Sequence, residues 1–176
     1  PRLNAAGRLD DMSLGIECLL TEDEGLALDM ARELDSLNRD RKAIERDMQQ
    51  QALKTLEAMQ LDEQDLPFGL CLFDAEWHQG VIGILASRLK DRFHRPVIAF
   101  APAQQRGQLK GSGRSIPGLH LRDALDAVAT ANPGLLSKFG GHAMAAGLSL
   151  ELEKLEATPE PEIIFSCTIS IKIITT

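Results

Sequence analysis

The longest regular pattern of apolar and polar positions lies in the first third of the chain. Between about Gly25 and Gln60 there is no proline and no further glycine, and apolar residues recur at steps of three, four or their sums. This period predicts a single amphipathic helix of about 35 residues, which would be about 50 Å long. Its apolar seam comprises Met30, Leu34, Leu37, Ile44, Met48, Leu56 and Met59. The seam needs a partner surface. The helix would either connect two domains or form a coiled-coil dimer, and the charged Arg41 on the seam makes the dimer the weaker interpretation.

After Pro67 the pattern changes to short apolar runs that alternate with helical segments, which is typical of an α/β fold. Phe68–Phe73 and Val97–Phe100 have the length and apolarity of buried central strands, and a helix from Val81 to Phe93 would cross between them. The further expected elements are 96–101, 108–114, 121–129, 135–139 and 143–150. We therefore expect a mixed β-sheet with flanking helices, preceded by the long helix.

Apolar and polar residues alternate along the last segment, Ile163–Ile174, which carries one charge. We therefore expect one strand that forms an aggregation-prone edge of a sheet. Its origin stays open between a native strand and an artefact of the sequence.

Composition narrows the class of protein. The chain has 176 residues, 44% of them apolar, which is enough for one globular domain with an appended helix. It contains no run of eighteen apolar residues and no pattern of a signal peptide, so we expect a cytoplasmic protein with no membrane segment. Cys18, Cys71 and Cys167 are odd in number and far apart, which favours buried thiols over disulfides or a zinc site. Because the chain begins at Pro1, inside a motif, we expect a fragment of a larger protein.

Charge is distributed in blocks of opposite sign. Residues 1–74 hold 8 Lys/Arg against 17 Asp/Glu, a net −9, and residues 151–176 hold 2 against 5, a net −3. Residues 75–150 hold 9 against 4, a net +5. A local basic face governs phosphate binding even in an acidic chain. A solvated surface without function explains the same block about equally well.

Two glycine-framed segments in this basic block predict a phosphate site. They contain Ser112, Gly113, Arg114 and Ser115 in the first segment, and Gly140, Gly141 and His142 in the second. Glycine allows a backbone to approach a ligand closely, and an arginine fork and a histidine supply donors to anionic oxygens. The alternative is that the glycines mark only a bulge and a turn.

A third segment, Trp77–Gly83, runs into a helix whose first turn would present free N–H groups to an anion. Trp77 could stack on a base, but core packing is the favoured interpretation. His94 and His120 lie near helix ends, where a capping or surface role is expected.

Four stretches together resemble one family. They are Pro1–Arg8, Trp77–Gly83, Gly111–Ser115 and Gly140–Gly147, within residues 1–150. They are similar to the RecJ family of bacterial single-strand-specific 5′→3′ DNA exonucleases, which belongs to the DHH phosphoesterase superfamily. The last stretch is shared across that superfamily, and the first two are more specific to RecJ.

The resemblance implies a two-lobed hydrolase of DNA repair and recombination, in which two Mn²⁺ or Mg²⁺ ions activate water. No Asp-His-His motif occurs in this chain, so the metal-binding lobe is expected upstream of Pro1, and this piece alone should be inactive. Asp10 and Asp11 are expected at the surface or at a helix start. The implied partners are single-stranded DNA, single-strand-binding protein and a helicase. The implied divisions are the end of the catalytic lobe (1–21), the connecting helix (22–63), the substrate-binding domain (66–150) and a divergent tail (151–176).

The resemblance also implies roles for the site residues. Ser112 and Arg114 would bind backbone phosphate, and His142 would contact the reacting phosphate as a donor, an acid or a positioning group. Gly140 and Gly141 would permit that approach, and the same cleft would include Asn4 and Arg8. Two alternatives remain: a phosphodiesterase of the same superfamily for oligoribonucleotides or cyclic dinucleotides, and a non-catalytic nucleic-acid-binding module.

Overall fold

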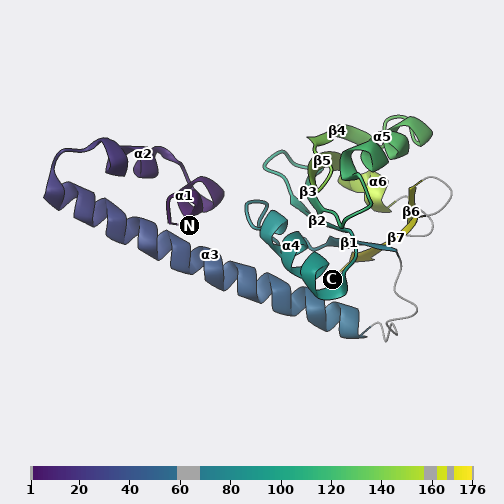
Figure 1. Cartoon of the computed structure of the whole chain (residues 1–176), viewed down its shortest axis with the longest axis horizontal. Coiled ribbons are helices and arrows are strands. Elements are labelled where there is room, and N and C mark those ends of the chain that lie inside the picture. Colours follow the sequence, from purple (N-terminus) through teal and green to yellow (C-terminus); the bar gives the residue numbers. More distant parts are fainter. Residues whose placement is uncertain (1, 59–67, 157–161, 166–168, 176) are drawn as a thin grey trace. The chain divides into compact units, whose positions relative to one another are not determined.

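The computed structural model describes residues 2–58, 68–156, 162–165 and 169–175 (Figure 1). The chain divides into two compact units, Pro1–Asp47 and Met48–Thr176. The long helix α3 (Glu24–Ala58) begins in the first unit and ends in the second. This helix confirms the prediction for 25–60 within the described residues, since residues 59 and 60 lie outside them. No described helix is long and apolar enough to cross a membrane.

The first unit is helical, with α1 (Arg2–Leu9) and α2 (Ser13–Leu20) preceding α3. Asp11 fixes the start of α2, because its carboxylate accepts hydrogen bonds from the Ser13 backbone N–H at 3.1 Å and from the Ser13 hydroxyl at 3.0 Å. These bonds favour the charged carboxylate and lower the pKa of Asp11. Asp11 therefore has the helix-start role that its sequence context predicts.

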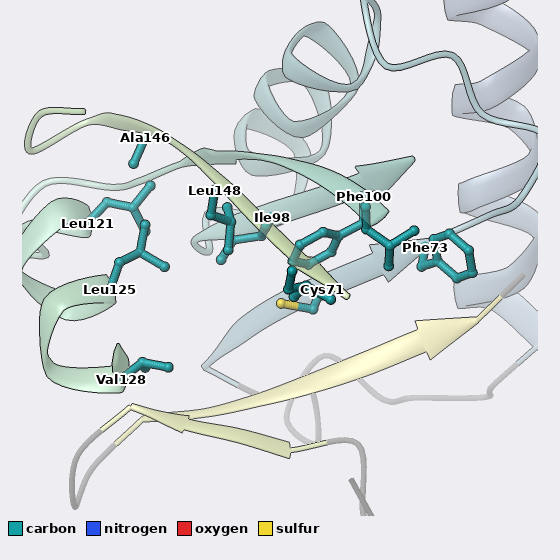
Figure 2. Close-up of a cluster of buried hydrophobic side chains, with 11 residues drawn as sticks. Cys71, Phe73, Ile98, Phe100, Leu121, Leu125, Val128, Ala146 and Leu148 are labelled. Carbon is teal, nitrogen blue, oxygen red and sulfur yellow. The ribbon is translucent and has the colours of Figure 1, made fainter. Parts of the chain in front are cut away.

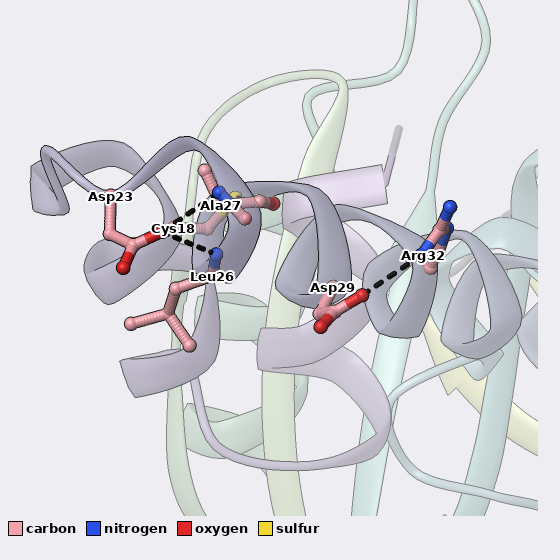
Figure 3. Close-up of polar contacts among 7 residues, drawn as sticks. Cys18, Asp23, Leu26, Ala27, Asp29 and Arg32 are labelled. Carbon is pink, nitrogen blue, oxygen red and sulfur yellow. Dashed lines mark hydrogen bonds and ion pairs between the residues drawn. The ribbon is translucent and has the colours of Figure 1, made fainter.

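The start of α3 is capped by Asp23 (Figure 3). Its Oδ1 accepts hydrogen bonds from the N–H groups of Gly25 at 2.8 Å and Leu26 at 3.0 Å, which satisfies two donors of the first turn. The Cys18 thiol donates to the Ala27 carbonyl at 3.7 Å and links α2 to α3. Along the helix, Arg2 of α1 binds Asp35, and this hydrogen bond lowers the pKa of the carboxyl.

The predicted seam of α3 is only partly buried. Leu34, Met48 and Leu56 are buried, whereas Met30, Leu37 and Ile44 are half-buried. Arg41 on the seam retains only 11% exposure, and its guanidinium lies 2.7 Å from the carboxylate of Glu45, one turn further on. The ion pair neutralises the charge that the seam would otherwise bury alone.

The second unit is built on a seven-stranded mixed sheet with the order β4-β5-β3-β2-β1-β7-β6. β1 is parallel to β2 and β7, and the remaining pairs are antiparallel. The elements are β1 (Gly69–Phe73), α4 (Ile82–Phe93), β2 (Val97–Pro102), β3 (Gln108–Arg114), α5 (Leu121–Ala131), β4 (Leu136–Gly141), β5 (Ala145–Glu151), α6 (Leu152–Glu156), β6 (Glu162–Phe165) and β7 (Ile169–Thr175). The predicted mixed α/β sheet with flanking helices is confirmed.

The expectation of one edge strand over Ile163–Ile174 is wrong. The segment contains two antiparallel strands, β6 and β7, and residues 171–175 of β7 pair with the whole of β1. All five residues of β1 are buried, so its second row of peptide groups needs a partner, and β7 supplies one. β7 is consequently an inner strand, and β6 forms the edge.

The main hydrophobic core lies between the sheet and α5 (Figure 2). Side chains of β1, β2 and β5 meet one face of the helix there. They are Cys71, Phe73, Ile98, Phe100, Ala146 and Leu148 from the sheet, and Leu121, Leu125 and Val128 from α5. Burial raises the pKa of the Cys71 thiol far above its usual value, so this cysteine is an inert buried group. Cys18 is half-buried, and Cys167 lies outside the described residues.

Helix α4 lies against β2 and β3 on the opposite face of the sheet. Ile82, Leu85 and Leu89 are buried there at helical spacing. Because the sheet is covered by α4 on one face and by α5 on the other, alternate residues of β3 point to two different environments.

Trp77 is a core residue, as the favoured interpretation predicted, with 3% of its surface exposed. Its indole N–H donates to the Gln51 side-chain oxygen at 3.0 Å, and the Gln51 amide donates to the buried Asp74. Asp74 also accepts from the Glu76 backbone N–H at 2.7 Å. This cluster attaches the last turns of α3 to the loop between β1 and α4.

Gln51→Ala should lower the free energy of unfolding of the second unit by about 1–2 kcal/mol, because it leaves the buried indole N–H without its acceptor. Urea unfolding followed by Trp77 fluorescence measures this change. Gln50→Ala, a neighbouring exposed position, is the control and should stay within about 0.5 kcal/mol of the original chain. Equal midpoints for both variants would contradict the role of Gln51.

Candidate functional site

The two glycine-framed segments lie on strands that are separated only by β5. Ser112 of β3 and Gly140 of β4 are both in register with Gly147 of β5. Neighbouring strands are about 4.8 Å apart, so Ser112 and Gly140 stand about 10 Å from each other across the sheet. The fold thus brings together the two segments that the sequence places about thirty residues apart.

Gly111 and Gly113 point to the α5 face, where they permit close packing. A Cβ atom on Gly111 would lie 2.6 Å from the Phe100 ring, and one on Gly113 would lie 2.7 Å from Leu121. Because β3 pairs with both β2 and β5, successive N–H groups point alternately to two strands rather than to one ligand. Gly113 therefore has a packing role in this structure, and its contact with phosphate stays a prediction.

Ser112 and Arg114 point to the α4 face. The Arg114 guanidinium donates to the Ser112 hydroxyl at 3.0 Å and to the Gly113 carbonyl at 2.7 Å. The first turn of α4 lies directly beside them, since a Cβ atom on Gly83 would be 2.9 Å from both Arg114 Nη2 and Ser112 Oγ. A guanidinium, a hydroxyl and the positive end of a helix are thereby gathered at one place, which suits an anion.

Ser115 is fully buried and belongs to the loop after β3. Its hydroxyl donates to the Leu119 carbonyl at 2.8 Å, and its backbone N–H donates to the Met144 carbonyl at 3.0 Å. These bonds hold the loop against the β4–β5 hairpin. The predicted contact of Ser115 with phosphate stays a prediction that this burial does not favour.

His142 is exposed in the turn between β4 and β5. Its backbone N–H donates to the Ala145 carbonyl at 2.8 Å, which closes the hairpin. The preceding Gly141 has φ +144, and a Cβ atom there would lie 2.4 Å from the same carbonyl. Only glycine fits this position, and its conformation fixes where His142 leaves the sheet.

Gly140 and Gly147 form a bare floor on the α4 face of the sheet. Both are exposed, and a Cβ atom on Gly140 would meet nothing within 4 Å. A Cβ atom on Gly147 would meet only the Gly111 carbonyl, at 3.9 Å. A ligand can approach the backbone closely here because neither of these two positions carries a side chain.

Asn4 and Arg8 lie one turn apart on α1 in the first unit, where Asn4 is exposed and Arg8 is half-buried. Their predicted place at the same cleft stays a prediction.

Sequence reasoning did not select Lys110 or Lys138, and it included Gly83 and Gly147 only as the last residues of longer motifs. Lys110 is two residues before Ser112, and Lys138 is two residues before Gly140, so the period of two was an available signal for both lysines. The sequence could not show that Lys110 and Lys138 lie on either side of Ser149, because that register depends on the place of β5 between β3 and β4.

The described residues do not provide a metal site. No group of three or more His, Cys, Asp or Glu side chains among them is arranged to hold an ion. The divalent cations that the resemblance implies therefore do not fit this part of the chain.

The chain belongs to the DHHA1 domain family, which matches residues 66–159. The RecJ single-stranded-DNA-specific exonuclease of Escherichia coli is 62% identical over 156 residues, 89% of this chain, and that of Thermus thermophilus is 35% identical over 151 residues, 86% of this chain. The chain spans 27% and 20% of their lengths.

Two solved structures share the fold. Exonuclease RecJ bound to manganese matches with a TM-score of 0.72 and 34% identity over 89% of this chain and 36% of that one. Thermus thermophilus RecJ in complex with Mg²⁺ matches with a TM-score of 0.75 and 29% identity over 99% of this chain and 26% of that one. The resemblance that the motifs predicted is confirmed.

The adjacent glycines of β4 give opposite expectations for stability. Gly141→Ala should lower the free energy of unfolding by about 2–3 kcal/mol, because the added Cβ atom collides with backbone at a positive φ. Gly140→Ala should change it by less than about 0.5 kcal/mol, since its Cβ atom enters open space. Urea unfolding followed by Trp77 fluorescence compares the two, and equal losses would contradict the assigned geometry.

Proposed function

We propose that this chain is part of a single-strand-specific 5′→3′ DNA exonuclease and that residues 66–150 bind its substrate. The observation that carries the proposal is the polar α4 face of β3, β5 and β4, where Arg114, Ser112 and the start of α4 adjoin the bare floor of Gly140 and Gly147. The identity of 62% to the E. coli exonuclease supports the same function.

In this proposal the sugar–phosphate backbone crosses the glycine floor. Arg114 and Ser112 donate hydrogen bonds to phosphate oxygens, and the N-terminal end of α4 adds its partial positive charge. Exposed His142, at the end of the hairpin, contacts the scissile phosphate. These contacts recognise the backbone and not the bases, so binding is independent of sequence and sensitive to salt.

Hydrolysis itself is assigned to a region outside the described residues. Manganese or magnesium ions held there would activate the attacking water, and this chain would hold and orient the strand. We further propose that the intact enzyme is cytoplasmic, acts in DNA repair and recombination, and works beside single-strand-binding protein and a helicase.

A graft tests the proposed activity. This chain, in place of the matching segment of E. coli RecJ, should retain Mn²⁺-dependent 5′→3′ hydrolysis of a labelled single-stranded oligonucleotide, because it would supply the same backbone contacts. The chain alone should not hydrolyse the oligonucleotide. The matched control is the unmodified E. coli enzyme, assayed on the same oligonucleotide and on a dinucleotide.

Each other outcome counts against the proposal in a different way. An inactive but folded graft would favour a non-catalytic binding module. A preference of the graft for dinucleotides would favour a phosphodiesterase of the same superfamily. Activity of the chain alone would show a metal site within these 176 residues.

Two substitutions in the graft separate binding from turnover. Arg114→Ala should raise KM and reduce the salt slope of binding by about 0.7, the value for one lost phosphate contact with a single strand. His142→Ala should lower kcat by about a hundredfold and change KM little. Steady-state kinetics at several salt concentrations measure both effects.

Each variant has a matched control. Arg122→Ala removes the same charge from α5, on the other face of the sheet. The Arg122 side chain pairs there with Asp123. His94→Asn replaces an exposed histidine at φ +52, which asparagine tolerates. Unchanged turnover for His142→Ala would remove His142 from the reaction.

A further inference from the structure

A surface hollow of about 320 Å³ adjoins the phosphate site on the α4 face of the sheet. Side chains of the β2–β3 turn, the start of β3, β4, β5 and the loop before α4 line it. They include Gln79, Gln105, Gln108, Lys110, Lys138 and Ser149. Among these described lining residues there are two lysines and no carboxylate, so the hollow is positively charged in an otherwise acidic chain.

The two lysines stand on either side of the hollow in one row of the sheet. Lys110 of β3 and Lys138 of β4 are both in register with Ser149 of β5. Both lysines are exposed, and no ion pair joins either of them to another described residue. Their Cα atoms are about 10 Å apart, since one strand separates them.

The hollow is continuous with the glycine floor. A second hollow of about 210 Å³ is lined by Lys110, Lys138 and Ser149 and extends to Gly147. Lys110, Ser112 and Arg114 occupy alternate positions of β3, so each step between them is about 6.7 Å. A strand whose phosphate lies at Arg114 and Ser112 therefore reaches the lysines within a few nucleotides.

The chemistry of the lining suits a nucleotide. Two ammonium groups provide donors and charge for a phosphodiester. The glutamine amides each offer donors and an acceptor, so they can bind the edge of any base. The described lining of the larger hollow contains no aromatic side chain, so a base there would be held by hydrogen bonds rather than by stacking.

We propose that this hollow is a second nucleotide subsite, in which Lys110 and Lys138 bind a later phosphate of the strand and the glutamines hold its base. The inference rests on the proposed function, because the strand must be continuous from Arg114. Two lysines would also suit an acidic peptide, but the unbroken polar track to Ser112 and Arg114 favours a phosphodiester.

The test measures binding by the 176-residue chain itself, with fluorescence anisotropy and 5′-phosphorylated oligothymidylates of two to twelve nucleotides. The Lys110→Ala and Lys138→Ala double variant should bind the twelve-mer about tenfold more weakly and the dinucleotide unchanged. Its salt slope should fall by about 1.4, the sum for two phosphates, so its loss of affinity between 50 and 200 mM salt should be about sevenfold smaller. Arginine at both positions should restore binding.

The matched control is the double variant Lys54→Ala and Lys90→Ala, which removes the same charge from α3 and α4 and should leave the twelve-mer affinity unchanged. Equal losses for the two double variants would overturn the subsite, because only net charge would matter. An equal loss for the dinucleotide and the twelve-mer would place both lysines at the first phosphate and overturn it too. Competition by oligoglutamate but not by oligothymidylate would assign the hollow to an acidic peptide instead.

The Arg114→Ala variant separates this inference from the function on which it rests. If Arg114→Ala weakens binding at every length and the lysine variant binds normally, only the second subsite fails. If the original chain binds no oligonucleotide, or Arg114→Ala has no effect at any length, the proposed function fails with it. Unfolding followed by Trp77 fluorescence should show the same midpoint for the original chain and the Lys110 and Lys138 variants, since both lysines are exposed.

Discussion

The close approach of two helices to β3 is the constraint on which the rest of the second unit depends. On one face, the missing side chains of Gly111 and Gly113 allow Phe100, Leu148 and Leu121 to fill the space over the strand. On the other face, the missing side chain of Gly83 allows the first turn of α4 to lie against Ser112 and Arg114. Interiors are packed as densely as organic crystals, so a methyl group at Gly111 would collide with Phe100 and Leu148, and one at Gly113 would collide with Leu121 of α5. The core and the candidate site therefore share β3, whose side chains alternate between the α5 face and the α4 face.

Glycine serves two different purposes on the same sheet. Gly111 and Gly113 are buried and make room for protein atoms, whereas Gly140 and Gly147 are exposed and leave room for a ligand. The difference follows from the face of the sheet on which each glycine lies. Gly147 is in register with Ser112 and with Gly140, and these three positions lie on the α4 face. A bare patch of sheet bordered by cationic side chains is suited to a chain of phosphates, which must come close to the backbone to be held by it.

Much of the fold could be predicted from local patterns, since α3 carries a helical period and β1 and β2 are short, continuous apolar runs. The tail could not, because whether Ile163–Ile174 forms one strand or two depends on the need of buried β1 for a second partner. For the site, the motifs selected Ser112, Arg114 and His142 as candidates, and their contacts with phosphate stay predictions. The motifs did not indicate that Gly113 packs against Leu121 or that the Ser115 hydroxyl donates to the Leu119 carbonyl. Lys110 and Lys138 were not candidates, because their register across Ser149 exists only after three strands have paired.

The distribution of charge along the chain favours one part of it as the proposed nucleic-acid interface. The first 74 residues carry a net −9 and residues 75–150 carry a net +5, so a nucleic acid is repelled by most of the chain and attracted to a limited part of it. Fields of this kind act over about one Debye length, about 8 Å at physiological salt, which is close to the spacing of alternate residues along β3. In the proposed interface a strand would therefore be guided by the few cations of the α4 face, and the loss of one lysine or arginine would change binding locally. If those contacts are to phosphate, as proposed, the same arrangement would accept every base in turn, as the proposed movement of an exonuclease along a single strand requires.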